Sequence, residues 1–121
     1  MPHAGGWREA GVVAEAHRFN VPPRWTAGGS QLPAGSLASC DDANLVLDTV
    51  KLAEDGDAVV LRLYECHGAR GSARVRVGWP VTKAARCNFL EEEQDGEAIS
   101  VSDGTLEVVY KPFQIITLKL E

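Results

Sequence analysis

Short apolar runs separated by turns decide what this chain can fold into. From Leu45 to Leu120, runs of valine, leucine and isoleucine end at turn sequences such as Asp55-Gly56 and Asp103-Gly104. The turns recur about every ten residues, which suits strands of ordinary length joined by hairpins. The pattern predicts an all-β fold, an antiparallel β-sandwich of about seven short strands. The expected strands are Asn44–Ala53, Ala58–Cys66, Ala73–Trp79, Val81–Leu90, Ile99–Val101, Thr105–Lys111 and Phe113–Leu120, with Glu91–Gly96 as a charged loop.

The run Ala73–Trp79 has the clearest alternation in the chain. Every second residue is apolar, whereas Arg74 and Arg76 lie between them. Because successive side chains of a strand point to opposite faces, we expect Trp79 to share the core with Val75 and Val77.

The first 39 residues lack the strand and turn pattern of the rest of the chain. Trp7–Asn20 can form a short helix, with Val12, Ala16 and Phe19 spaced along one face. Prolines 22 and 23 then stop the helix. The stretch Ala27–Ser39 is rich in glycine, serine, alanine and proline and is expected to be an irregular linker. We therefore expect an interdomain segment at 1–39 and a β-sandwich domain at 40–121.

Charge and hydropathy exclude two classes of partner. Twelve basic and seventeen acidic residues give a net charge of −5, whereas nucleic-acid affinity depends on clustered lysine and arginine. No run approaches the ~18 consecutive apolar residues of a membrane helix. The chain is thus expected to be soluble, without nucleic acid or membrane as partners. Three widely spaced cysteines, Cys40, Cys66 and Cys87, fit reduced thiols in the cytoplasm better than a disulfide framework.

Histidine, cysteine and acidic residues are present, but their spacing matches no common metal-binding or catalytic motif. His3, His17 and His67 form no HxH, HxxxH or HExxH arrangement. Cys66 and His67 are adjacent on an expected strand and should point to opposite faces, so they make no dyad. Most acidic side chains fall in expected hairpin loops, where aspartate commonly supports turns. We expect no catalytic, cofactor-binding or metal-binding residue. The acidic candidates considered are Asp41, Asp42, Asp55, Asp57, Glu91, Glu92, Glu93 and Asp103.

Three segments resemble glycoside hydrolase family 38 α-mannosidases of the cytosolic and bacterial type. Pro2–Pro23, with Pro-His, Gly, Trp-Arg, Ala-Gly, Asn and Pro in order, is similar to the segment that follows the catalytic and helical domains of that family. Leu45–Val75 resembles its C-terminal sandwich more closely. So do the NFLEEE sequence at Asn88–Glu93 and the KPFQIITLKLE sequence at Lys111–Glu121.

The resemblance implies a role without chemistry of its own. Family members are retaining exo-α-mannosidases whose zinc ligands and nucleophilic aspartate lie in the N-terminal catalytic domain, and none of those motifs occurs here. The chain is then expected to be a non-catalytic C-terminal fragment that buttresses the catalytic and helical domains of a parent enzyme. Zinc and the α-mannoside substrate would belong to that parent, and the fragment alone would be inactive.

Two alternatives remain open: an autonomous carbohydrate-binding module and a protein-interaction sandwich. A carbohydrate module needs exposed aromatic side chains on one sheet face, and the strands offer only Tyr64, Trp79 and Tyr110 without a shared exposed face. Trp25 lies in an irregular segment and is expected to be exposed. Uncovered apolar residues of the first 39 would also favour a homodimer. They are Trp7, Val12, Val13, Phe19, Val21 and Trp25.

The absence of a ligand set with usable spacing generates a test. The isolated chain should neither hydrolyse aryl α-mannosides nor hold stoichiometric zinc. Metal analysis of protein purified without a histidine tag, with an activity assay on the same sample, measures both. One tightly held zinc ion per chain would contradict the prediction.

Overall fold

The computed structural model describes residues 2, 4–28 and 35–121, apart from the side chains of residues 95–98. The chain forms two compact units, Met1–Ala34 and Gly35–Glu121. Within the described ranges, no helix is long and apolar enough to cross a membrane.

The first unit contains one helix, α1 (Val12–Asn20). It follows Gly11, whose φ of 65° is left-handed and suits glycine. It ends where Asn20 Nδ2 donates to the Ala16 carbonyl (2.8 Å), two residues before Pro22. The predicted helix is confirmed, but it starts later than Trp7, because residues 7–11 form turns.

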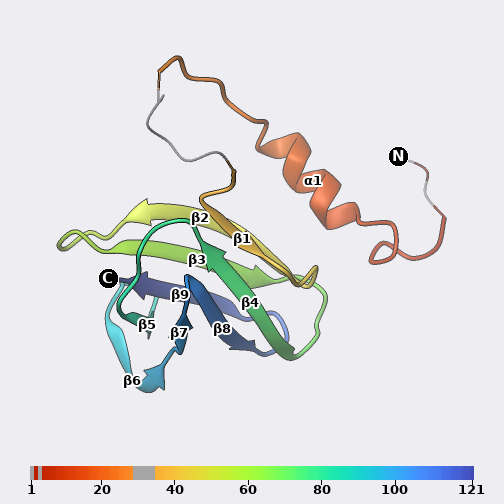
Figure 1. The fold of residues 1–121 in the computed structure, drawn as a ribbon. Coiled ribbons are helices and arrows are strands. Elements are labelled where there is room, and N and C mark those ends of the chain that lie inside the picture. Colours follow the sequence, from red (N-terminus) through yellow and green to blue (C-terminus); the bar gives the residue numbers. More distant parts are fainter. Residues whose placement is uncertain (1, 3, 29–34) are drawn as a thin grey trace. The chain divides into compact units, whose positions relative to one another are not determined.

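The second unit is a sandwich of two antiparallel sheets (Figure 1). Strand order is β1-β4-β8-β7 in the four-stranded sheet and β2-β3-β9-β5-β6 in the five-stranded sheet. The all-β prediction is confirmed. The strands are β1 (Ala38–Cys40), β2 (Leu45–Leu52), β3 (Val59–Glu65), β4 (Gly71–Val77), β5 (Ala84–Cys87), β6 (Glu93–Ala98), β7 (Val101–Ser102), β8 (Thr105–Tyr110) and β9 (Ile115–Leu120).

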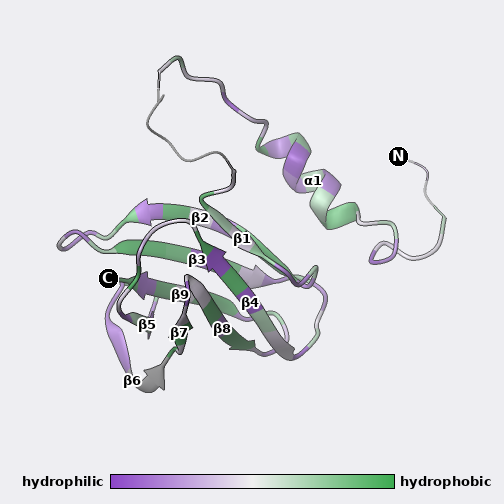
Figure 2. Ribbon diagram, in the orientation of Figure 1, coloured by the Kyte–Doolittle hydropathy of each residue, from purple (hydrophilic) through white to green (hydrophobic). Residues whose placement is uncertain are grey.

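The core lies between the sheets and consists of alternate residues of the strands. On β4, Ala73, Val75 and Val77 are buried while the residues between them are exposed, as the alternation predicts. Figure 2 shows the green, apolar stretches concentrated on the strands of both sheets. The side chains with least exposure are Leu61, Leu63, Leu106, Ile116, Leu118, Leu120, Val60, Val75 and Val108.

Several local predictions differ from the structure. The expected strand Val81–Leu90 is shorter, because β5 covers only Ala84–Cys87. Glu93–Ala98, expected within a charged loop and its flank, is strand β6, which pairs with β5 (Cys87 opposite Glu93). Ala38 and Ser39, assigned to the linker, belong to β1 and pair with β4 (Ala38 opposite Val77). Ile99 lies outside any strand. Strands β6 and β1 have weak sequence patterns, because pairing with a neighbouring strand, rather than their own apolar residues, keeps them extended.

Trp79 is only half-buried, which corrects its expected place on a strand. β4 ends at Val77; the Gly78 N–H donates to the Leu37 carbonyl (2.8 Å), one pair beyond Ala38 and Val77, and Trp79 lies two residues past the end of the strand. The indole still packs against the core from its edge. Truncating Trp79 should therefore cost less than the about 3–5 kcal/mol of a fully buried tryptophan.

The two leucines Leu118 and Leu52 provide a matched test of the core. Leu118 is fully buried on β9 and Leu52 is exposed at the end of β2. Leu118→Ala should lower the free energy of unfolding by about 2–5 kcal/mol, and Leu52→Ala by about 0.5 kcal/mol or less. Urea denaturation of both variants measures the difference, and equal losses would show that the core is placed incorrectly.

Candidate functional site

The loop between β5 and β6 lies on the outer face of the five-stranded sheet, the face turned away from the core. The Asn88 side-chain oxygen holds this loop by accepting hydrogen bonds from the N–H groups of Leu90 (2.9 Å) and Glu92 (3.1 Å). Glu91 adopts a left-handed backbone with φ 68°, and its side chain is buried. The loop thus has a defined shape that turns one carboxylate toward the sheet.

Glu91 fastens the loop to two strands. Its carboxylate lies 2.8 Å from Lys51 Nζ on β2 and 3.6 Å from Arg62 Nη2 on β3. It also accepts a hydrogen bond from the Glu54 N–H (2.8 Å). The lysine hydrogen bond, with the Glu54 N–H next in weight, lowers the pKa of Glu91 below its ordinary value.

Arg62 fixes Phe89 on the same loop. The guanidinium carbon lies 4.2 Å from the Phe89 ring centroid, a cation–π contact. Nη2 of Arg62 donates to the Phe89 carbonyl (3.0 Å). Its Nε atom is buried without a hydrogen-bond partner, so stacking and Nη2 hold this side chain.

Glu65, at the end of β3, anchors the opposite end of this face. Its carboxylate accepts four backbone N–H groups: those of His67 (2.8 Å), Gly68 (2.8 Å) and Ala69 (3.0 Å) in the β3–β4 loop, and that of Phe113 (2.7 Å). The residue is 3% exposed. Burial by itself raises the pKa of Glu65, but the four hydrogen bonds outweigh it and lower that pKa to about 2.

Phe113 is held in a conformation that few bulky residues adopt. Its φ is 56°, in the left-handed region, where the hydrogen bond to Glu65 helps to keep it. The ring lies over Gly68: a Cβ added at residue 68 would come within 2.8 Å of Phe113 Cζ. Gly68, with φ 72°, is therefore required both by its own backbone and by the ring above it.

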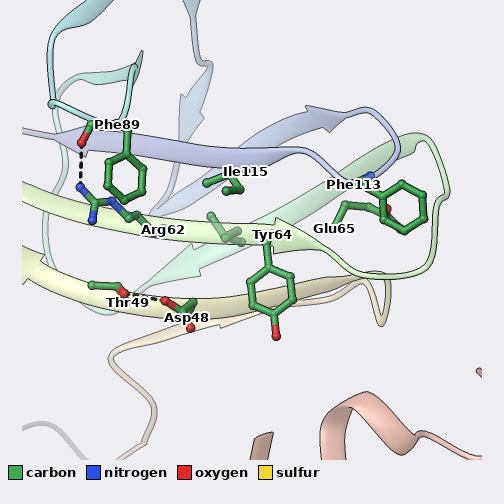
Figure 3. Close-up of a pocket in the computed structure, with 9 residues that line it drawn as sticks. Asp48, Thr49, Arg62, Tyr64, Glu65, Phe89, Phe113 and Ile115 are labelled. Atoms are coloured by element: carbon green, nitrogen blue, oxygen red, sulfur yellow. Dashed lines mark hydrogen bonds between the residues drawn. The ribbon is translucent and has the colours of Figure 1, made fainter.

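Between these anchors lies a groove of about 370 Å³ (Figure 3). Arg62 and Tyr64 alternate with the core residues of β3, so they face outward into it. A register shift between Leu47 and Thr49 marks a bulge on β2 at Asp48, and the Thr49 hydroxyl donates to the Asp48 carboxylate (2.8 Å). The groove is lined by Asp48, Thr49, Arg62, Leu63, Tyr64, Glu65, Phe89, Phe113 and Ile115.

The carboxylates considered from the sequence mostly serve the fold. Asp41 accepts the Arg74 N–H (2.7 Å) and so extends the pairing of β1 with β4. Asp42 accepts the Tyr110 hydroxyl (2.6 Å) and the Asn44 N–H (2.8 Å). Asp103 occupies a left-handed turn position, φ 48°. Asp55 and Asp57 line a second hollow of about 360 Å³, together with Lys119 and Glu121.

The histidine and cysteine candidates also have local partners. His67 Nδ1 lies 3.0 Å from Asn44 Oδ1, and Cys66 Sγ donates to the Asn44 carbonyl (3.4 Å). Burial raises the pKa of the Cys66 thiol, which disfavours a thiolate nucleophile. His17 lies on α1, and His3 lies outside the described residues.

Among the residues that the structure describes, no three His, Cys, Asp or Glu side chains come together as a metal site. The three cysteines are free thiols in the structure.

The aromatic residues of the groove were missed by sequence reasoning. Phe89 and Phe113 fall within the expected strands Val81–Leu90 and Phe113–Leu120, but the structure places them in the turns after β5 and before β9, where they line one groove with Tyr64. Tyr64, Trp79 and Tyr110 share no exposed face, but Tyr64 lines the groove with these two phenylalanines, which were not among the aromatic residues expected on the strands. Tyr110 is buried on the core side of β8, where its hydroxyl donates to Asp42. Trp25 is exposed, as expected. The signal available in the sequence was that each phenylalanine directly follows a residue type common in turns, Asn88 before Phe89 and Pro112 before Phe113.

Two antiparallel sheets around one apolar core define the class of this protein as a β-sandwich domain. Residues 44–118 match the sequence pattern of the glycosyl hydrolases family 38 C-terminal beta sandwich domain, and the chain belongs to this family. It is 34% identical over 125 aligned residues to alpha-mannosidase 2C1 of Homo sapiens, and equally to that of Mus musculus; each match covers 99% of this chain. Alpha-mannosidase G of Dictyostelium discoideum is 26% identical over 127 residues, covering 98% of this chain. The chain spans only 12%, 12% and 11% of the length of these relatives.

Glu65 generates a pH-dependent test. The folded pKa of about 2 lies below the ordinary 4.5, so the stabilisation is complete above about pH 4.5 and is lost as the pH falls toward 2. Glu65→Gln removes the charge and one acceptor atom, and should lower the free energy of unfolding by about 2–4 kcal/mol at pH 7. Urea denaturation at several pH values should also show a weaker acid dependence than in the unmodified chain.

Glu107→Gln, an exposed carboxylate on β8, is the matched control. It should change stability by about 0.5 kcal/mol or less. If the two variants behave alike in stability and in acid dependence, the anchoring role of Glu65 is wrong.

Proposed function

We propose that this chain is the non-catalytic C-terminal sandwich of a longer retaining, zinc-dependent α-mannosidase. In this proposal the sandwich buttresses the catalytic and helical domains, which hydrolyse terminal α-mannosides. The parent supplies the zinc ion and binds the substrate. The protein works in the cytoplasm, which three free thiols support, because cytosolic proteins keep their cysteines reduced.

One observation carries the proposal: the buried or ordered carboxylates of the sandwich are engaged with its own backbone and side chains. Glu65 is saturated by four N–H groups, and Glu91 by Lys51, Arg62 and the Glu54 N–H. Asp42 is held by Tyr110. A glycosidase needs two carboxyl groups free to act on either side of a sugar. Groups committed to holding loops instead support a structural domain.

The second candidate function is a carbohydrate-binding module. Tyr64, Phe89 and Phe113 around one groove favour it, because aromatic faces stack on the apolar faces of sugar rings. It is distinguished by titrating the isolated chain with methyl α-mannoside and mannobiose. Saturable binding that is lost in Phe113→Ala would support it over a purely structural role.

A chimera tests the structural role. This chain should replace the matching segment of human alpha-mannosidase 2C1, to which it is 34% identical. We expect the chimera to hydrolyse aryl α-mannosides and the isolated chain to show no activity. We expect deletion of the segment to lower the thermal midpoint and the yield of active enzyme, because a covering domain is lost.

Three outcomes contradict the proposal. Hydrolysis by the isolated chain would make it catalytic. Full activity and stability of the deletion would leave the domain without a buttressing role. An insoluble or inactive chimera, under conditions in which the unmodified human enzyme is active, would show that this sandwich cannot replace the matching segment of that enzyme.

A further inference from the structure

We propose that the groove bordered by Tyr64, Phe89, Phe113 and Ile115 is the face by which the sandwich docks on an apolar surface elsewhere in its longer polypeptide. This inference rests on the proposed function and specifies the part of the domain that makes the contact. Its occupant is a protein surface of aliphatic and aromatic side chains, rather than a sugar or an anion.

The groove exposes large apolar side chains together. Phe89 is 63% exposed, Phe113 69% and Ile115 62%. All three line one hollow on one sheet face, with Ile115 between the two rings (Figure 3). Contiguous apolar patches of this kind are uncommon on monomers and commonly mark protein contacts.

The outer face of the other sheet differs in character. On β4, Ser72, Arg74 and Arg76 are exposed, and Arg74 lies opposite Glu107 of β8. The charged side chains of this row are well solvated, whereas the apolar side chains of the groove gain nothing from contact with water. The two faces of one small domain therefore differ in the way expected when only one of them is covered.

Two of the three charged groups that line the groove are compensated from within. Glu65 receives four backbone hydrogen bonds, and Arg62 contacts Phe89 and Glu91. The third, Asp48, is exposed and accepts the Thr49 hydroxyl, which does not neutralise its charge. An apolar surface can therefore cover Glu65 and Arg62 without leaving a buried charge unpaired, while Asp48 stays in contact with water.

Backbone strain points to the same face. Phe113 is a bulky residue with φ 56°, a conformation that costs energy and persists only when its surroundings impose it. Glu65 and Gly68 impose it here, through a hydrogen bond and a close ring contact. The result is an exposed phenyl ring whose backbone is held in place. An aromatic side chain on a backbone that is already ordered loses less entropy on binding than one on a mobile loop.

The relatives indicate what would cover the groove. This chain spans 12% of alpha-mannosidase 2C1, so the matching sandwich there is attached to a much longer polypeptide. Attachment gives the remainder a high effective concentration, and an apolar face of moderate size then suffices for docking. This favours the same polypeptide over a second copy of the chain as the occupant.

The test compares Ile115→Glu with Val109→Glu. Val109 is 61% exposed and lies on the outer face of the other sheet, so the two changes are matched in exposure and chemistry. Both are placed in the chimera with human alpha-mannosidase 2C1, and release of the sandwich by limited proteolysis is followed. Loss of one aliphatic contact should raise the fraction of molecules with an undocked sandwich about tenfold. Because the protease cuts the undocked form, Ile115→Glu should release the domain about tenfold faster. Val109→Glu should match the unmodified chimera.

Measurements on the isolated 121-residue chain complete the test. Both variants should unfold at the same urea midpoint as the unmodified chain; a midpoint lowered only by Ile115→Glu would assign the residue to the fold and overturn the inference. Ile115→Thr, a milder change that keeps a β-branched side chain, should release the domain faster than Val109→Thr. Saturable binding of methyl α-mannoside that Ile115→Glu abolishes would identify a sugar site instead. Dimers of the isolated chain that Ile115→Glu dissociates would identify a second copy instead.

The inference and the proposed function fail differently. If the unmodified chimera is active and stable but the two glutamate variants behave alike, docking uses another face and the proposed function stands. If deletion of the whole segment changes nothing, the proposed function itself is wrong.

Discussion

The Glu65 carboxylate is the interaction on which the outer face of the five-stranded sheet depends. It joins the end of β3, the loop that leads to β4 and the turn that leads to β9 through four N–H groups. Without it, these backbone donors would lose a buried acceptor, and Phe113 would lose the contact that helps to hold its left-handed backbone. The pKa of about 2 expresses the same fact in chemical terms, since the ionised form is the one that the loops require.

A second buried carboxylate, that of Glu91, anchors a loop at the other end of the face. It ties the β5–β6 loop to Lys51 and Arg62, and the loop carries Phe89 over the guanidinium. These charged groups therefore border the groove, whose most exposed side chains include the aromatic Phe89 and Phe113 and the aliphatic Ile115. Such a surface is suited to contact with other protein rather than to chemistry, and membership of a glycosidase family does not alter this.

Much of the fold could be predicted because its causes are local. Alternation on β4 and the Asp-Gly turns each determine backbone geometry within a few residues. β6 and β1 could not be predicted in this way. Residues 93–98 are polar enough to read as a loop, and only pairing with β5 makes them a strand. Trp79 was expected on β4 but lies two residues beyond its end at Val77, because β4 pairs with β8 and β1, and the place where these pairings stop is set by segments distant in the sequence.

The sequence by itself determined the fold class, the short helix, the family and the lack of motif spacings typical of a metal or catalytic site, since all of these depend on spacing along the chain. Only the tertiary structure decided the groove. Tyr64 comes from β3, Phe89 from a loop after β5 and Phe113 from the turn before β9, and pairing of β3 with β9 and of β9 with β5 brings them to one face. Aromatic residues in loops have no periodicity that would reveal such a neighbourhood, because their positions are set by contacts with other segments, Arg62 of β3 for Phe89 and Glu65 of β3 for Phe113.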